Sequence, residues 1–387
     1  MNDLFIGFTS LAGTDGILRI LMMLIGILLI WLAIKKEYEP MLLLPIGFGA
    51  ILVNLPLSVA FEYEGAPGFL KILFEAGIAT ELFPVLIFIA VEAMCDFGPM
   101  FQNPVMMFFG AAAQFGIFFT VLAALALGRA FPQLGFDLPT ASAIGIIGAA
   151  DGPTSIYVAS KFARPYLGPI SVAAYSYMSL VPLIQPPVIK ALTSKKERVI
   201  KMKINTASYP RGLRIVFPIA VTVIAGLVAP MSVPLIGSLM FGNLIRECGV
   251  LEKLSLAAQN ELASIVTLLL GITIGSSMRA DQFLRPQTLI ILALGLVAFI
   301  FDTAGGVLFA KFLNLFRKEG DKINPMVGAA GISAFPMSAR VIQKLATAED
   351  GNTFVIMEAV SANVSGQLGS VMAGGIVLAL VPVLMGW

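Results

Sequence analysis

The stretch Gly145–Ser155, with the sequence GIIGAADGPTS, places a single acid, Asp151, after apolar sequence and directly before Gly152 and Pro153. Proline cannot donate a backbone hydrogen bond and glycine permits unusual backbone angles, so we expect a helix to open beside this carboxylate. Free carbonyls next to a carboxylate are the oxygen ligands that hard cations prefer. The same residues also form an ordinary helix start with Asp151 as its N-cap, and this alternative stays open.

The composition around this stretch is that of a membrane protein. The chain has 387 residues, of which 58% are hydrophobic and 12% are charged, whereas about 25% are charged in an ordinary soluble domain. Apolar stretches long enough for a bilayer core, which needs about 20 residues per helix, recur almost from end to end. The sequence therefore predicts an all-α integral membrane protein.

About ten transmembrane helices are expected, interrupted by two broken segments. The spans are predicted at about 17–34, 42–60, 80–95, 105–128, 167–189, 215–229, 231–245, 264–278, 287–312 and 353–385. Two further stretches, about 139–160 and 324–345, are rich in glycine, alanine, proline and serine. We expect these to be re-entrant or discontinuous, which a membrane tolerates only where protein or a water-filled cavity satisfies the freed backbone groups.

An internal repeat relates the two halves of the chain. The matches are Pro40-Met41 with Pro230-Met231, Asn54 with Asn243, Phe101-x-x-Pro104 with Phe283-x-x-Pro286, and Gly148-Ala-Ala with Gly328-Ala-Ala. Five spans and one broken segment per half make an odd count, so the second half should be inverted, as in many secondary transporters. We expect a first repeat at 17–189, a basic loop at 190–214 and a second repeat at 215–385.

Charge suggests how the chain is oriented. The segment 190–214 carries eight lysines and arginines against one acid, so by the positive-inside rule it is cytoplasmic. Lys35 and Lys36 after the first span agree, and place the N-terminus outside. Arg279 and Arg285 fall on the outer side, against the rule.

Several classes of chemistry are excluded. The chain has no histidine, and its two cysteines, Cys95 and Cys248, form no CxxC pair, so neither a histidine base nor a cysteine zinc site is expected. No phosphate-binding GxxxxGK[ST] motif occurs. Met202 lies between two lysines, the reverse of a biotin-acceptor site, so this chain should not carry biotin. Nothing indicates nucleic-acid binding.

The second broken segment and the last span supply further polar groups. Asn324, Ser333 and Arg340 lie in the segment, and the last span carries a stripe with Ser361, Asn363, Ser365, Gln367 and Ser370. Arg340 is expected to pair with an acid or hold a carboxylate, or to snorkel at a helix end. The serines suit helix packing equally well. Of the remaining acids, Glu92 and Glu358 lie in or near spans, and Asp96 and Asp302 are expected near span ends.

The two signatures Gly148-Ala-Ala-Asp151-Gly-Pro-Thr154 and Asn324-Pro-x-x-Gly328-Ala-Ala-Gly-x-Ser333-Ala-x-Pro336-Met-x-x-Arg340 resemble the β subunits of biotin-dependent, sodium-pumping decarboxylases. That family serves oxaloacetate, methylmalonyl-CoA, glutaconyl-CoA and malonate systems. The resemblance implies that a carboxyltransferase and a biotin carrier deliver carboxybiotin, which this subunit decarboxylates while it exports sodium and consumes a proton. A small single-span γ/δ-type subunit, a homo-oligomer, membrane lipids and the prokaryotic inner membrane are implied as well.

The family's functional residues fall on Asp151, Tyr177, Asn324, Gly328, Ser333 and Arg340. We expect Asp151, Asn324 and Ser333 to bind sodium, with Gly328 and Asn363 beside them. Tyr177 would donate a proton and Arg340 would meet the carboxyl group. Sodium and a proton should compete at Asp151, because a cation disfavours the protonated acid.

Two other functions use the same features. A sodium/proton antiporter or sodium-coupled carboxylate carrier would have the same repeats and buried acid without decarboxylase chemistry. A structural anchor for soluble subunits would need neither feature.

Overall fold

The computed structural model describes residues 7, 10–11, 13–37, 39–202 and 210–387. Lys203 in the basic loop, and most of the sequence before Gly13, lie outside the described residues. Within the described part the chain is helical apart from one short hairpin, whose strands β1 (Glu62–Tyr63) and β2 (Ala66–Pro67) pair antiparallel. The predicted all-α class is confirmed.

Six helical stretches among the described residues are long and apolar enough to cross a membrane. They are α2 (Thr14–Lys36), η4 with α7 and α8 (Pro104–Met106, Met107–Ala112, Phe115–Ala130), α14 (Arg211–Val228), α16 with η9 and α17 (Glu252–Ala257, Ala258–Leu262, Ala263–Ser276), α19 (Pro286–Asn314) and α21 (Ile356–Met385).

Two bent pairs bring the number of candidate spans to eight. In the first, α4 and η3 (Phe69–Leu73, Phe74–Ile78) meet α5 (Leu82–Glu92) at 65°. In the second, η7 and α11 (Arg164–Tyr166, Leu167–Ser179) meet α12 (Val181–Leu192) at 69°. Both η3 and η9 are single π-helical turns, which bend helices at defined points. The protein is therefore a multi-pass membrane protein.

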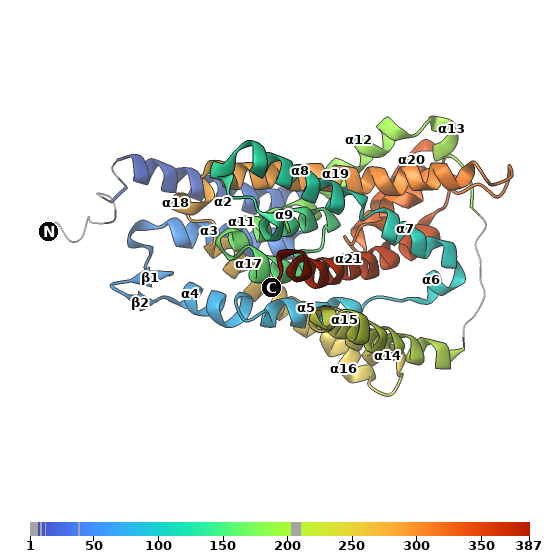
Figure 1. Ribbon diagram of the computed structural model, residues 1–387, viewed down its shortest axis with the longest axis horizontal. Coiled ribbons are helices and arrows are strands. Elements are labelled where there is room, and N and C mark those ends of the chain that lie inside the picture. Colours follow the sequence, from blue (N-terminus) through green and yellow to red (C-terminus); the bar gives the residue numbers. More distant parts are fainter. Residues whose placement is uncertain (1–6, 8–9, 12, 38, 203–209) are drawn as a thin grey trace.

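The remaining helices are short. They are α3 (Pro40–Asn54), η2 (Pro56–Ser58), α6 (Gly98–Gln102), η5 (Pro132–Leu134), α9 (Leu138–Gly145), η6 (Ile146–Ala149), α10 (Gly152–Phe162), α13 (Lys195–Arg198), η8 (Pro230–Ser232), α15 (Val233–Glu247), α18 (Ala280–Phe283), η10 (Pro325–Gly331) and α20 (Met337–Glu349). Figure 1 shows the hairpin and α18 at one end of the long axis and α13 at the other, with α19 running between them.

Both predicted broken segments are confirmed as breaks. The first runs as α9 and η6, stops at Ala150, and resumes as α10; Ala150 has a left-handed φ of 51°. The second runs as η10, passes through an irregular stretch, and resumes as α20. Asp137, Asp151 and Asn324 cap α9, α10 and η10 through their side-chain oxygens, which satisfies backbone donors left free at those helix starts.

Two asparagines form hydrogen bonds between the two halves of the chain. Asn54, at the end of α3, donates to the carbonyl of Met278 at 2.7 Å and accepts from the N–H of Ala280 at 2.9 Å. Asn243, in α15, donates to the carbonyl of Cys95 at 3.4 Å. Each asparagine thus binds the chain just after a helix of the opposite half.

One expectation about the buried acids is wrong. Asp302 was expected near a span end, but it lies in the middle of the 29-residue helix α19 and is fully buried. The helix matches the predicted span at 287–312 closely, so the extent of the helix was predicted correctly and only the placement of Asp302 near its end was wrong.

Candidate functional site

The two broken segments meet at their breaks. The backbone N–H of Ser333, just after η10, donates to the carbonyl of Ala149, the last residue of η6, at 3.0 Å. This bond closes the gap left where neither segment continues its own helix. The breaks are therefore the point at which the two halves of the chain meet.

Asp151 lies at this junction with its carboxylate held on several sides. One oxygen accepts from the Thr154 N–H at 3.3 Å, and the other accepts from the Thr154 hydroxyl at 2.6 Å and the Ser370 hydroxyl at 2.8 Å. The Ser333 hydroxyl is a further partner. The side chain is 5% exposed, and no lysine or arginine pairs with it among the described residues. Burying a carboxylate without a counter-charge is costly, so such a group binds a proton or a cation.

Helix α21 adds oxygens beside the junction. The amide of Asn363 donates to the Ile332 carbonyl at 2.7 Å, while its own Oδ1 is buried without a partner in the described part of the chain. Ser370, two turns further along the same helix, supplies the hydroxyl that donates to Asp151. Hydroxyl and amide oxygens around one carboxylate suit a hard monovalent cation better than a transition metal. Consistently, no group of three or more Cys, Asp and Glu ligands gathers among the described residues.

The two tyrosines of α11 face different neighbours. Tyr177 donates its hydroxyl to the carbonyl of Leu292, and its ring packs on Gly295, both in α19. Tyr175 packs directly against Gly152, where an added Cβ would lie 2.2 Å from its Cζ, and its buried hydroxyl has no partner among the described residues. The structure therefore brings Tyr175 to Asp151 and leaves Tyr177 on α19.

The structure does not bring Asn324 to Asp151. Its amide donates to the carbonyls of Arg198 at 2.8 Å and Ile200 at 3.0 Å, and its Oδ1 caps η10. Because the seven residues of η10 rise by roughly 2 Å each, Asn324 lies at the far end of that helix from Ser333. It ties the second broken segment to the basic loop instead.

Gly328, in the middle of η10, allows a close helix crossing. A Cβ on Gly328 would lie 2.0 Å from the carbonyl oxygen of Gly306 in α19, and a Cβ on Gly306 would lie 2.0 Å from that of Gly328. The expected close backbone approach is present, but it is an approach to another helix.

Arg340 lies one turn into α20 and is exposed. Its positive charge acts on Glu39, between α2 and α3: burial raises the pKa of Glu39, and the charge of Arg340 acts in the opposite direction. Arg340 therefore does not pair with Asp151, and its guanidinium remains open to an anion.

Sequence reasoning missed a chain of buried groups that leads away from Asp151. Ser370 also donates to the backbone carbonyl of Gln367 at 2.9 Å, and the Gln367 Oε1 accepts from the Cys95 thiol at 2.9 Å. Glu92 is a further partner of Cys95 and is 1% exposed. Only the acid at membrane depth was visible in sequence, because Cys95 and Gln367 are 272 residues apart.

Asp302 forms a second buried carboxylate near the first break. One oxygen accepts from the N–H of Ile117 at 3.1 Å at the start of α8. The other has no partner among the described residues and lies against Gly148 of η6, where an added Cβ would be 2.5 Å away. Asp302 thus joins α8, α19 and the first broken segment.

Comparison with known proteins identifies the family. Residues 18–381 match the family model for the Na⁺-transporting oxaloacetate decarboxylase beta subunit. The chain belongs to this family. It is 48% identical to the glutaconyl-CoA decarboxylase subunit beta of Acidaminococcus fermentans, covering 98% of this chain and 99% of that one.

Two further relatives act on different substrates. The oxaloacetate decarboxylase beta chain of Klebsiella pneumoniae is 44% identical, covering 92% of this chain and 94% of the relative. The methylmalonyl-CoA decarboxylase subunit beta of Propionigenium modestum is 45% identical, with 93% and 94% coverage. The protein is a membrane subunit of a sodium-translocating, biotin-dependent decarboxylase, which disfavours the carrier and anchor alternatives.

Proposed function

We propose that this subunit decarboxylates carboxybiotin presented by a carrier subunit, and that the reaction drives sodium export through the junction of the two broken segments. The observation that carries the proposal is the buried Asp151 carboxylate at the junction, where Ser370 of the second half donates to it at 2.8 Å and the Ser333–Ala149 bond joins the two broken segments. One carboxylate is shared by two halves of the protein, so occupancy of this site by a cation is linked to how the halves pack.

The reaction requires one proton for each carboxybiotin. The bond between the biotin ring nitrogen and the carboxylate carbon breaks, CO₂ leaves, and the electron pair on nitrogen takes up a proton. We assign Tyr177 as the proton donor, supported by its spacing of 26 residues after Asp151, which matches the family's functional tyrosine, and by its hydroxyl, which donates to a backbone carbonyl and so keeps its proton.

We assign the sodium site to Asp151, Ser333 and Asn363. Support comes from the carboxylate and hydroxyl contacts at the junction and from the unpartnered Asn363 Oδ1. Sodium and a proton would be alternative occupants of Asp151, which couples their movements. Asn324 and Gly328 would act at a distance, by fixing the ends and the crossing of η10.

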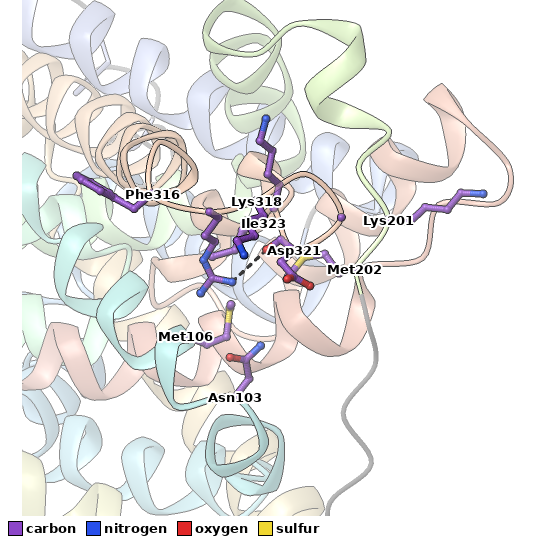
Figure 2. A pocket seen from close by; sticks show the side chains of 11 residues that line it. Asn103, Met106, Lys201, Met202, Phe316, Lys318, Asp321 and Ile323 are labelled. Atoms are coloured by element: carbon purple, nitrogen blue, oxygen red, sulfur yellow. Dashed lines mark hydrogen bonds between the residues drawn. The ribbon is translucent and has the colours of Figure 1, made fainter.

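We place the arrival of the carboxyl group at the basic end of the molecule. Arg340 would meet it, since its exposed guanidinium presents a fork that matches a carboxylate. A cavity of about 470 Å³ opens at this end between Asn103 and Met106 at η4, Met202 and the loop after α19 (Figure 2). Lys201, Lys318 and Lys322 surround it, and Arg317 donates to the Asp321 carbonyl within it. This charge favours an anionic group or an acidic carrier surface.

We further propose that the chain consists of two inverted repeats with ten spans. The π-turns η3 and η9 occupy matching places in the two halves, as do the breaks after η6 and η10. The asparagine bonds agree: Asn54 binds the Met278 carbonyl and Asn243 binds the Cys95 carbonyl, so each half offers the same residue to the same place in the other. The repeat boundaries would be 17–189 and 215–385.

The partners follow from the β-subunit family. Carboxyltransferase and biotin-carrier subunits are expected in the complex, and we propose a single-span γ/δ-type subunit, a homo-oligomeric assembly and residence in a prokaryotic inner membrane. Which acid the complex decarboxylates is a property of the carboxyltransferase.

The test is reconstitution of the subunit in liposomes with free carboxybiotin on the side of the basic loop. The proposal predicts sodium-stimulated release of CO₂ together with movement of ²²Na⁺. Sodium movement that is indifferent to carboxybiotin would contradict it.

A further inference from the structure

A second cavity, of about 520 Å³, lies at the end of the molecule opposite the basic loop. It is bounded by Phe61 beside the hairpin, by η7, and by the links on both sides of α18. Figure 1 shows the hairpin and α18 together at this end, far from α13. The cavity is separate from the Asp151 junction.

Three arginines from three different connections line this cavity. Arg164 comes from the α10–α11 turn, Arg279 from the α17–α18 link and Arg285 from the α18–α19 link. Ser277 and Gln287 add neutral hydrogen-bonding groups, and no acidic side chain lines the cavity in the described part of the chain. The lining is therefore rich in donors and strongly positive.

Two of these three arginines, Arg164 and Arg285, have guanidinium N–H groups that no described residue accepts. Arg279 binds the Asp281 carboxylate through two bonds of 3.1 Å and lies 5.3 Å from the centre of the Phe61 ring. Arg285 donates only through Nε, to the Asp281 carbonyl at 2.9 Å. The Arg164 guanidinium forms no hydrogen bond or ion pair with any described residue. The surplus positive charge thus belongs to Arg164 and Arg285.

The acids near the cavity do not cancel this surplus. Asp281 is engaged by Arg279, and Glu62 of the hairpin pairs with Lys71 at 2.5 Å. A hydrogen bond from Lys71 holds the pKa of Glu62 below its usual value. The charge left over faces the cavity.

The position of these arginines in the membrane is unusual. Arg279 and Arg285 lie at the end opposite the cytoplasmic basic loop, and topology is set by keeping lysine and arginine on the cytoplasmic side. Because these arginines gather around one cavity rather than spreading over the surface, an anion bound in the cavity would neutralise their positive charge and offset this disadvantage. A guanidinium fork matches a phosphate or carboxylate with two parallel bonds.

We propose that this cavity binds the phosphodiester headgroup of an anionic phospholipid in the outer leaflet. Apolar side chains next to the lining residues favour a lipid over a free oxyanion: Val59, Phe69 and Ile72, close to Phe61 and Phe74, are 55%, 49% and 52% exposed. These side chains offer contact to acyl chains while the arginines hold the phosphate.

A bound headgroup would clamp the helices that lead to the ion site. Gly168, at the start of α11, packs so closely against Ser277 that an added Cβ would lie 2.7 Å from the Cβ of that serine. The preceding helix, α10, carries Asp151 at its other end. A phosphate bridging Arg164 to Arg285 would therefore fix the α10–α11 turn to the start of α19. This inference does not depend on the decarboxylase chemistry.

The test compares the full-length wild-type protein with an Arg164→Gln/Arg285→Gln variant and a matched Arg129→Gln control. Arg129 is an exposed arginine in the last turn of α8 that does not line the cavity. Each protein in detergent is titrated with phosphatidylglycerol, phosphatidylcholine or inorganic phosphate while its unfolding temperature is followed, and native mass spectrometry counts the lipid retained.

The proposal predicts that phosphatidylglycerol stabilises the wild type and the Arg129→Gln protein alike, and that the double variant needs at least about tenfold more lipid, since two charge-assisted contacts are lost. Equal stabilisation of wild type and double variant would overturn the proposal. So would phosphatidylcholine acting as strongly as phosphatidylglycerol, or inorganic phosphate alone reproducing the full shift, which would make the site one for a free oxyanion.

Discussion

Substitution of Gly328 by alanine tests whether the packing of η10 sets the geometry of the junction. The new Cβ would lie 2.0 Å from the Gly306 carbonyl oxygen, so η10 and α19 must separate by about 1.4 Å to reach an ordinary contact of 3.4 Å. Overpacking of this kind costs about 1–3 kcal/mol. Because η10 leads directly to Ser333, the shift is carried to Asp151, and a displacement of about 1 Å at a reacting site costs about 100-fold in rate.

We therefore expect Gly328→Ala to lower carboxybiotin decarboxylation about 100-fold, while the protein stays folded. Gly306→Ala opens the same crossing from the other side, where its Cβ would also meet a carbonyl oxygen at 2.0 Å, and should have the same effect. Gly212→Ala is the matched control, since nothing lies within 4 Å of its added Cβ. The assay is sodium-dependent CO₂ release, with thermal unfolding measured in parallel. Wild-type rates and sodium dependence in Gly328→Ala would refute the reasoning.

Three further predictions concern single side chains. Ser370→Ala removes a 2.8 Å bond to Asp151 and should weaken sodium binding about tenfold, because hydrogen bonds to charged groups contribute about 1.5–3 kcal/mol; unchanged sodium titrations would count against the site. Tyr177→Phe should abolish decarboxylation but retain ²²Na⁺ binding, whereas Tyr175→Phe should weaken binding; the reverse pattern would exchange their roles. Burial alone would raise the pKa of Glu197, but hydrogen bonds from Ser194 and Lys311 hold this pKa below the usual value of 4.5. The Glu197 carboxylate therefore stabilises the fold fully above pH 4.5. This stabilisation is lost as the pH falls through the pKa of the folded state. The difference in unfolding temperature between wild type and Glu197→Gln should therefore shrink on acidification, and a constant difference would contradict this assignment.

The sequence predicted the junction well because its signals are local. Gly152 and Pro153 break a helix wherever it lies, and Asp151 is conspicuous as an acid in apolar sequence. The repeat then predicted a partner segment, and Ser333 meets Ala149 as expected.

Other parts of the site depend on geometry that local sequence does not encode. Tyr175 and Tyr177 are two residues apart, so on a helix they point to nearly opposite sides, and spacing from Asp151 could not decide between them. Asn324 was expected at the junction from the family resemblance alone, but it begins η10 and lies nine residues before Ser333, at the other end of that helix. Cys95 reaches Gln367 only because the chain just after α5 passes beside α21.

The remaining differences concern charged residues. Asp302 was expected near a span end although the predicted span at 287–312 already placed it well inside, and α19 matches that span closely. Arg279 and Arg285 ran against the positive-inside rule until the cavity that they share was visible.

The most direct measurement is equilibrium binding of ²²Na⁺ to the purified wild-type protein, Asp151→Asn and Asp137→Asn. Both aspartates cap a helix by accepting from the residue three positions later, at 3.3 Å for Asp151 and 2.9 Å for Asp137, and asparagine caps equally well. The two substitutions therefore match in the capping bond and in the loss of one negative charge, but only Asp151→Asn removes a charge from the junction. We predict that Asp151→Asn loses sodium binding by about 100-fold or more while Asp137→Asn binds as the wild type does. Wild-type sodium binding by Asp151→Asn would contradict the central claim.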